Sequence, residues 1–379
     1  VNALYLTPIF PAFSNHRYDV TEYEHVDASL GGDKAFISLR ERTRAADVRL
    51  MLDIVPNHCG VMHPWFQAAL ADAQAETAEF FTFFDHPHVY ACWLGVQSLP
   101  KLNYRSQKLR EWMYVGDGSV FRRWLRSPFS IDAWRIDVAN MLARQGEAQL
   151  GVEIGTGIRA AVKEENSQAY LLGENFFDGS RQLQGDFLDG CMNYAGFARP
   201  LWHWISQASI WVLTCNEGVY SKMAISTAAM VQSWGNFLAA IPWQIAQQQF
   251  NLLGSHDTAR IRTVAGEELE RVHMAAALLL TYPGVPCIYY GDEIGMSSAD
   301  GENRACMVWD EKDWDGDLRA YFQRLIALRK ESMALRRGGF QVLEVEDDGL
   351  VYLRDVEDEQ IIVVAWRGVV ARAASGVSV

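Results

Sequence analysis

The sequence lacks the features that point to a membrane span or a nucleic-acid partner. It contains no run of about 18 apolar residues, which a membrane-spanning helix would need. Lys and Arg total 34 against 47 Asp and Glu, so the formal net charge is -13. Such an acidic chain is a poor partner for nucleic acid or an anionic membrane surface. We therefore expect a soluble protein that binds a neutral ligand.

The sequence also lacks a disulfide or metal-binding pattern among its cysteines. No CxxC and no other metal-ligand spacing occurs, which is typical of reduced thiols in a cytosolic protein. No secretory signal peptide is visible at Val1, although the chain does not begin with Met. We therefore predict a cytoplasmic location. The six scattered cysteines are Cys59, Cys92, Cys191, Cys215, Cys287 and Cys306.

What the sequence does contain is apolar and aromatic side chains in a chain of 379 residues. Hydrophobic residues make up 49%, which is enough for a large core, and 13 Trp, 14 Tyr and 18 Phe are present. Most of these rings belong in a core, but a groove lined by rings suits the flat apolar faces of sugars. Aromatic content therefore favours a carbohydrate ligand without establishing one.

Apolar runs alternate with helical patterns along most of the chain, which predicts an α/β fold with parallel strands. We predict seven strands with crossover helices, whereas a (β/α)8 TIM barrel needs eight. The missing first strand is expected upstream of Val1. The predicted strands are 2–10, 48–55, 131–137, 169–174, 187–194, 250–255 and 285–290, and the predicted helices are 33–46, 118–126, 152–165, 221–247, 267–280 and 316–331.

Two segments depart from this alternation and suggest a division into domains. Residues 59–110 are rich in aromatic residues and follow the second strand, so we predict an inserted subdomain there. From residue 338 to 379 short alternating strands predict the start of a C-terminal antiparallel β-sandwich domain. The catalytic barrel, from its second strand onward, is then assigned to residues 1–337.

The predicted strand 131–137 carries a cation and a carboxylate on one face, at Arg135 and Asp137. Unpaired buried charge is costly, so the pair needs an explanation. One reading is a structural ion pair within the core. The other is a carboxylate that the guanidinium keeps ionised, so that it acts as a nucleophile at neutral pH.

Polar residues also follow other predicted strands at their carboxyl ends, where the active site of a barrel lies. Each group could be a helix cap or a brace for a loop, but four groups at the same rim favour a functional site. Two carboxyl groups that flank one bond are sufficient to cleave a glycosidic linkage. The four groups are Asp53, Asn57 and His58; Arg135 and Asp137; Glu174 and Asn175; and Ser255, His256 and Asp257.

Five short segments together resemble the signature regions of the α-amylase family of retaining glycoside hydrolases. Four are DIVPNH (53–58), WRIDVAN (134–140), GEN (173–175) and GSHDTAR (254–260), and the fifth is LPKLN (99–103). The Lys-containing form of the fifth segment is similar to that of the neopullulanase and cyclomaltodextrinase group, and the whole chain is most similar to bacterial maltodextrin glucosidase. The resemblance implies a TIM barrel and cleavage of α-1,4-glucosidic bonds of short maltodextrins.

The resemblance also implies roles for individual residues. Asp137 would be the nucleophile, Glu174 the general acid and base, and Asp257 the group that binds the hydroxyls of the reacting sugar. We expect a raised pKa for Glu174 and a distance of roughly 5 Å between the carboxyl groups of Asp137 and Glu174. The substrate-binding residues would be Tyr18, Asp53, His58, Arg135, His256 and Arg260.

No cofactor or metal is expected. Asn57 matches a position that binds calcium in many secreted amylases, but the segment 59–110 is not rich in carboxylates, so Ca²⁺ is not favoured. A metal site built from Asp53, His58 and His63 matches no zinc spacing.

Three alternatives remain open for the function. Met141 stands where neopullulanase-type enzymes usually show Glu, which leaves chain length and the balance of hydrolysis and transglycosylation undecided. A cyclomaltodextrinase or neopullulanase that acts on cyclodextrin or pullulan is the first alternative, and transfer to another sugar is the second. The third is a sugar-binding homologue without catalysis. We expect an oligosaccharide substrate, and a homodimer is a further option.

Overall fold

The structure is a computed structural model that describes residues 1–206, 210–214, 217–221, 224–298 and 303–367. The chain divides into two compact units, which we treat separately. Unit 1 comprises Val1–Asn175 and Arg181–Cys191, and unit 2 comprises Phe176–Ser180 together with the described residues of Met192–Val379.

Unit 1 is built on a five-stranded parallel sheet with the order β1-β2-β7-β10-β11. The three central strands are almost entirely buried, as expected for parallel strands that are covered on both sides, whereas Ala3 and Leu4 of the edge strand β1 are exposed. Helices α1 (Gly32–Ala45), α4 (Val120–Arg123) and α5 (Gly151–Glu165) belong to the same unit. The strands are Ala3–Leu6, Arg49–Ile54, Ala133–Ile136, Tyr170–Gly173 and Gly190–Cys191.

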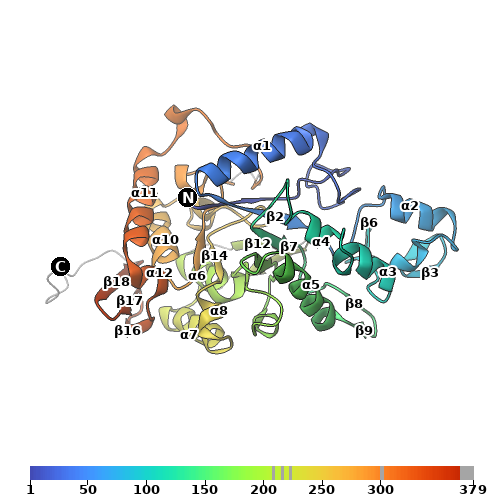
Figure 1. Ribbon diagram of the computed structural model, residues 1–379. Coiled ribbons are helices and arrows are strands. Elements are labelled where there is room, and N and C mark those ends of the chain that lie inside the picture. The colour runs from blue at the N-terminus through green and yellow to red at the C-terminus, as the bar shows by residue number, and fades with distance from the viewer. Residues whose placement is uncertain (207–209, 215–216, 222–223, 299–302, 368–379) are drawn as a thin grey trace, which may run out of the picture. The chain divides into compact units, whose positions relative to one another are not determined.

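The segment between β2 and α4 forms small elements of its own at one end of unit 1 (Figure 1). Two antiparallel hairpins, β3 with β4 and β5 with β6, lie between helix α2 (Pro64–Ala71) and helix α3 (Gln107–Arg110). A π-helical turn at Glu111–Val115 then leads to α4. The hairpin strands are Phe83–Asp85, Val89–Tyr90, Cys92–Trp93 and Val96–Pro100.

Unit 2 contains a parallel pair of strands, a hairpin and most of the remaining helices. Strands β14 (Phe250–Leu252) and β15 (Val285–Cys287) are parallel, whereas β12 (Ile210–Thr214) and β13 (Glu217–Ser221) are antiparallel. The helices are α6 (Arg199–Ile205), α7 (Thr227–Ala239), α8 (Trp243–Ala246), α9 (Ile261–Val264), α10 (Leu269–Thr281), α11 (Gly316–Glu331) and α12 (Met333–Arg337).

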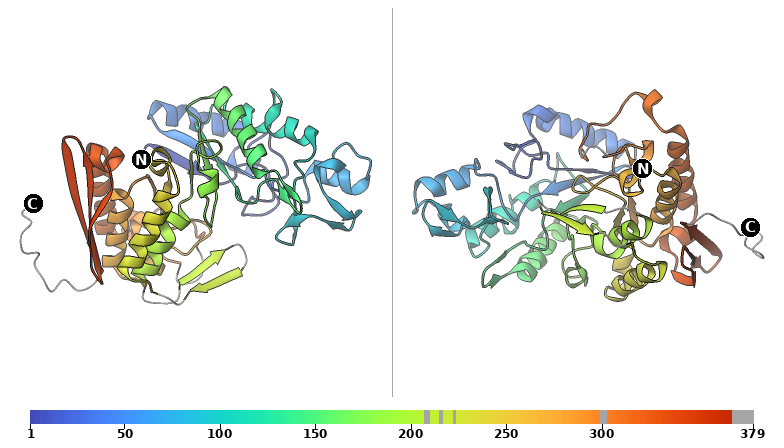
Figure 2. Two further views of the ribbon diagram at one scale, coloured as in Figure 1. Left: turned by 90° about the horizontal axis from the view of Figure 1, so that it is seen from below. Right: turned by 180° about the vertical axis from the view of Figure 1, so that it is seen from behind.

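The C-terminal part of unit 2 is a three-stranded antiparallel sheet, as predicted for the residues after 338. Strands β16 (Gln341–Val345), β17 (Gly349–Val356) and β18 (Glu359–Trp366) pair in sequence order. They lie beside helices α10, α11 and α12 in all views (Figures 1 and 2). Tyr352 of β17 is fully buried, so this sheet contributes to a core.

All seven predicted parallel strands are present, but several predicted boundaries were wrong. The predicted helix 221–247 is interrupted: α7 ends at Ala239 and α8 begins at Trp243, because Pro242 disfavours a helical conformation at Ile241. The predicted strand 187–194 is only two residues long and leads into a π-helical turn at Tyr194–Ala198. The predicted helix 118–126 is limited to Val120–Arg123.

Within the described residues, no helix combines the length and apolar character needed to cross a membrane.

Candidate active site

Three neighbouring strands of unit 1 carry most of the predicted site. Asp53 of β2 and Arg135 of β7 are direct partners in the parallel register. Asp137 and Glu174 come directly after β7 and β10, and their backbone N–H groups donate to the carbonyls of Ile54 and Ile136. Because these strands are parallel and in register, their side chains reach the same edge of the sheet.

The guanidinium of Arg135 joins all three carboxylates. Its Nη1 lies 3.0 Å from both oxygens of Asp53 and 3.0 Å from Oδ1 of Asp137, and its Nη2 lies 3.1 Å from Oε2 of Glu174. The side chain is fully buried. Burial opposes its charge, but the carboxylates of Asp53 and Glu174 outweigh this and hold the pKa of Arg135 well above its ordinary value. Arg135 is therefore a permanent cation between the carboxylates.

Asp53 is held by tyrosine hydroxyl groups as well as by Arg135. Tyr5 donates to Oδ2 of Asp53 at 2.7 Å, and Tyr18 donates to the same oxygen at 3.0 Å. The guanidinium carbon of Arg135 also lies 5.7 Å from the centroid of the Tyr18 ring. These bonds favour a bracing role for Asp53. Tyr5 was not predicted as a site residue; its hydroxyl within the apolar run NALYLTPIF was the available signal.

Glu174 is oriented by the backbone of the residue after the predicted nucleophile. Oε2 of Glu174 accepts a hydrogen bond of 2.8 Å from the N–H of Val138. Val138 has a φ of 47°, which is rare for a β-branched residue and is typical of functional sites. Both Asp137 and Glu174 therefore depend on the chain direction that this strained residue sets.

His58 lies beside Asp137 as a buried neutral ring. Burial and the positive charge of Lys101 lower the pKa of His58 to about 3. The amide nitrogen of Asn57 lies 3.1 Å from Nδ1 of His58, so Nδ1 is the acceptor and the proton is on Nε2. That nitrogen lies 4.0 Å from Oδ2 of Asp137. A neutral donor next to a carboxylate suits a hydrogen bond to a sugar hydroxyl.

Lys101, from the predicted fifth motif, is also buried in unit 1. Its Nζ donates to the carbonyl oxygen of Met141 at 3.2 Å. Burial, together with the nearby charge of Arg144, lowers the pKa of Lys101 to about 8. The Lys-containing motif and the unusual Met141 are therefore in contact.

In unit 2, Asp257 is held by a histidine and an arginine. Nε2 of His256 lies 3.0 Å from Oδ2 of Asp257, and Nη2 of Arg304 donates to Oδ1 at 2.9 Å. Arg304 and Asn303 also donate to the carbonyl oxygen of His256, each at 2.8 Å. Arg304 was not predicted as a site residue, because its distance in sequence from Asp257 hides the contact.

Arg260 is a buried structural residue of unit 2. Its Nη1 donates to the carbonyl oxygen of Tyr290 at 2.6 Å and to Oδ1 of Asp292 at 3.2 Å. Its guanidinium carbon lies 4.6 Å from the centroid of the Tyr289 ring. Burial raises the pKa of Asp292 to about 7, although Arg260 acts in the opposite direction. These contacts join Arg260 to the residues after β15, and its expected substrate-binding role stays a prediction.

The expected absence of calcium stays a prediction. Among the described residues, Oδ1 of Asn57 is buried without a hydrogen-bond partner, and Ca²⁺ takes 6–8 oxygen ligands. In the part of the chain that the structure describes, no group of three or more His, Cys, Asp or Glu is arranged to hold a metal. The chemistry proposed below uses no metal.

Comparison with known proteins identifies the family. The model of the alpha amylase catalytic domain matches residues 1–317. The chain belongs to the α-amylase family. The TIM barrel is the fold of this catalytic domain, so the predicted family and barrel fold are confirmed.

Curated members of the α-amylase family match almost all of the chain. A cyclomaltodextrinase of Geobacillus thermopakistaniensis (strain MAS1) is 35% identical over 377 residues, covering 97% of this chain and 59% of that protein. An intracellular maltogenic amylase of Bacillus subtilis is 31% identical over 374 residues, covering 96% of this chain and 58% of that protein. The chain thus spans about three-fifths of the length of these relatives.

Solved structures of α-amylase family proteins are similarly close. Cyclic alpha-maltosyl-(1→6)-maltose hydrolase from Arthrobacter globiformis has a TM-score of 0.85 at 31% identity, with 97% of this chain and 78% of that chain covered. A debranching enzyme from Nostoc punctiforme has a TM-score of 0.85 at 30% identity, with 96% and 74% covered. The prediction that the whole chain is most similar to bacterial maltodextrin glucosidase stays a prediction.

Proposed function

We propose that this chain is the catalytic part of a retaining glycoside hydrolase that cleaves α-1,4-glucosidic bonds of short maltodextrins. The observation that carries the proposal is the arrangement of Asp137 and Glu174 on the two nitrogens of one buried guanidinium. A retaining enzyme needs its two carboxyl groups roughly 5 Å apart, and a shared Arg135 favours such proximity. Membership of the α-amylase family supports the same chemistry.

In the proposed reaction, Asp137 attacks the anomeric carbon while the bond from that carbon to the leaving oxygen breaks. Glu174 transfers its proton to the leaving oxygen, and a glycosyl ester on Asp137 results. Glu174, now a carboxylate, takes a proton from water, and the water oxygen displaces Asp137. The sugar leaves with its configuration retained, and both carboxyl groups return to their starting states.

The remaining site residues would bind the sugar and support the two reacting groups. Arg135 stabilises the ionised form of Asp137 by its charge. His58 would donate to a hydroxyl from Nε2, and the ring of Tyr18 would stack beneath the reacting sugar. We assign Asp257, with His256 and Arg304 as its supports, to the binding of sugar hydroxyls.

Replacement of the nucleophile tests this function. Asp137→Asn should lower kcat on maltotriose roughly 10³-fold or more, because the amide cannot form the glycosyl ester. The fold should survive, which circular dichroism would check. Asp358→Asn, at an exposed position in the turn between β17 and β18, is the matched control and should keep full activity. Near-full turnover by Asp137→Asn would disprove the assignment.

Substrate preference is the second question, and the names of the relatives favour a second candidate substrate. The relatives reported above are named cyclomaltodextrinase and maltogenic amylase, so a cyclodextrin or pullulan substrate, with transglycosylation, is the second candidate. Products from maltotriose, cyclodextrin and pullulan, separated by chromatography, would distinguish the two. Binding of all three sugars without any product would instead support the non-catalytic homologue.

The domain layout and location complete the proposal. The seven parallel strands would be the second to eighth of the barrel, with residues 59–110 as an inserted subdomain and residues 338–379 as part of a C-terminal β domain. The name of the intracellular maltogenic amylase supports a cytoplasmic location. A homodimer stays a prediction, which size-exclusion chromatography with light scattering would test.

A further inference from the structure

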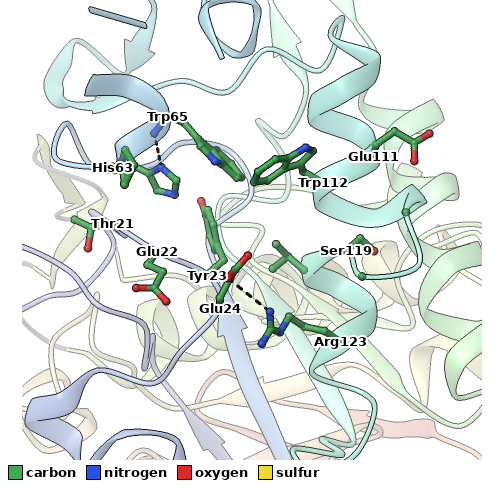
Figure 3. Close-up of a pocket in the computed structure, with 14 residues that line it drawn as sticks. Thr21, Glu22, Tyr23, Glu24, His63, Trp65, Glu111, Trp112, Ser119 and Arg123 are labelled. Atoms are coloured by element: carbon green, nitrogen blue, oxygen red, sulfur yellow. Dashed lines mark hydrogen bonds and ion pairs between the residues drawn. The ribbon is translucent and has the colours of Figure 1, made fainter. Parts of the chain in front are cut away.

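Unit 1 contains a pocket of about 330 Å³ that is lined by none of the active-site residues named above (Figure 3). Its walls come from the loop after Val20, the beginning of α2, the π-helical turn and the beginning of α4. The volume falls within the range of about 300–1,000 Å³ that is usual for small-molecule sites. The proposed function leaves this pocket unexplained.

Two tryptophan rings form the apolar part of the pocket. The rings of Trp65 and Trp112 meet edge to face with centroids 5.4 Å apart (Figure 3). Trp112 keeps 45% of its surface exposed. Tyr23 and His63 lie beneath Trp65, with ring centroids 5.9 Å and 4.4 Å from it. An exposed indole supported by a packed second ring offers a rigid flat face for a ligand.

Two buried polar groups in the lining have no hydrogen-bond partner among the residues that the structure describes. His63 is 3% exposed, and its Nδ1 accepts the backbone N–H of Trp65 at 3.2 Å. Burial lowers the pKa of His63 to about 3, so the ring is neutral and its proton is on Nε2. That nitrogen has no acceptor, and Oγ of Ser119, also 3% exposed, has no partner either. Such orphaned groups in a pocket indicate a ligand that both donates and accepts.

The charges of the pocket select against an anion. Glu22, Glu24 and Glu111 line it together with a single cation, Arg123, which lies 3.9 Å from Glu24. A simple cation would leave the donor on His63 unpaired, because it carries no acceptor. A sugar ring satisfies all of these conditions: its hydroxyls donate to carboxylates and accept from His63, while its flat C–H face packs on Trp112.

We propose that this pocket is a second carbohydrate site, separate from the active site, that binds a glucosyl unit of an α-glucan chain. The choice of an α-glucan rests on the proposed function, since the same polymer would be the substrate. Binding here would anchor the chain to the protein at a point that takes no part in bond cleavage. Trp112 is the stacking platform, and His63 and Ser119 are the polar contacts.

Affinity electrophoresis through gels that contain amylose tests the proposal. Trp112→Ala should weaken the retardation of the protein by amylose about tenfold, expressed as a dissociation constant. Trp243→Ala is the matched control, because this tryptophan is also partly exposed, at 37%, but lies in α8 of unit 2. Equal retardation of the parent protein and Trp112→Ala would overturn the site. Equal retardation in a gel of β-1,4-glucan would overturn the α-glucan assignment.

Ser119→Ala provides the sharper variant, because the Ser119 hydroxyl makes no hydrogen bond to any described residue. We expect unchanged thermal unfolding together with several-fold weaker binding to amylose; unchanged binding by both this variant and Trp112→Ala contradicts the proposal. Hydrolysis of maltotriose, measured in parallel, should be unaffected by either variant. If the parent protein hydrolyses no maltotriose but its retardation by amylose still depends on Trp112, the proposed function is rejected and the second carbohydrate site is kept.

Discussion

Two buried histidines of unit 1 are neutral in the folded protein, and each uses Nδ1 as an acceptor. Burial lowers the pKa of His58 and of His63 to about 3, with the charge of Lys101 contributing at His58. At His63 the accepted N–H belongs to Trp65 at the beginning of α2, so the ring also caps that helix. Protonation would place a charge in each of these buried sites, so both rings stay neutral until the pH falls toward about 3.

This burial predicts how stability depends on pH. The folded pKa of His63, about 3, lies below the ordinary value of 6.5, so between these values the unfolded chain binds more protons. Stability is therefore full above pH 6.5 and is lost as pH falls toward 3, by about 1.4 kcal/mol per pH unit for each such histidine. His63→Asn keeps a side chain that can cap α2. It should lower the slope of stability against pH by the contribution of one histidine, about 1.4 kcal/mol per pH unit.

Urea unfolding at pH 7, 6 and 5 measures that slope. His88→Asn, at an exposed position in the hairpin region, serves as the control and should leave the pH dependence as in the parent protein. An unchanged slope in His63→Asn would show that this ring accepts a proton in the folded state.

Helix α5 approaches its neighbours so closely that two of its glycines have no room for a side chain. A Cβ at Gly155 would lie 2.5 Å from the ring of Phe187, and one at Gly157 would lie 2.7 Å from the ring of Tyr114. Ile154 and Ile158 of the same helix are fully buried. Sequence alone suggests only weaker helix propensity at these glycines, whereas packing explains why they are present.

We therefore expect opposite effects from two Gly→Ala replacements in helices. Gly155→Ala should destabilise the protein by about 1–3 kcal/mol, because the ring of Phe187 must move in a packed core. Gly235→Ala in α7, where a Cβ would meet no atom within 4 Å, should stabilise it by about 0.5–1 kcal/mol. Thermal unfolding of both variants measures the difference, and a gain in Gly155→Ala would refute this account of α5.

The C-terminal sheet and the preceding helices of unit 2 share one core. Arg354 of β17 is 1% exposed and donates to the carbonyl groups of Thr281, Gly338 and Gly339. The ring of Phe340 lies 5.2 Å from the rings of both Tyr282 and Tyr352. These contacts join the sheet to the end of α10. A domain boundary near residue 338 stays a prediction, and these bonds offer a way to test it.

Arg354→Ala should destabilise unit 2 as a whole, by about 3 kcal/mol or more, because three buried carbonyl groups lose their donor. Limited proteolysis should then cut within α10 and α11 as well as within the sheet, in one cooperative step. Arg337→Ala, at an exposed position in α12, is the control and should change little. Cleavage confined to residues 341–367 would mean that the sheet unfolds independently.

Much of the candidate site could be predicted because its residues lie in parallel strands or directly after their carboxyl ends. Asp53, Arg135, Asp137 and Glu174 were all predicted from strand patterns and from the short motifs around them. The register of β2, β7 and β10 then places these side chains together on one guanidinium. A strand pattern is short in range, so the amino-acid sequence suffices to identify it.

The residues that sequence reasoning missed depend on contacts between distant segments. Tyr5 reaches Asp53 across 48 positions, and Arg304 reaches Asp257 across 47. The only local signal for Tyr5 is a hydroxyl within an apolar run, and no local pattern marks Arg304. The orphaned donor on His63 and the hydroxyl of Ser119 in the second pocket are a further example, because only packing reveals that neither has a partner.

The amino-acid sequence alone determined the family, the α/β alternation and the identity of the proposed reacting carboxyl groups, because each depends on residue types at short spacing. Only the tertiary structure decided which groups share Arg135, which histidines are kept neutral, where α5 must carry glycine, and that Trp65 and Trp112 meet at a pocket. These properties depend on burial and on distances between remote segments, and both are set when the chain packs.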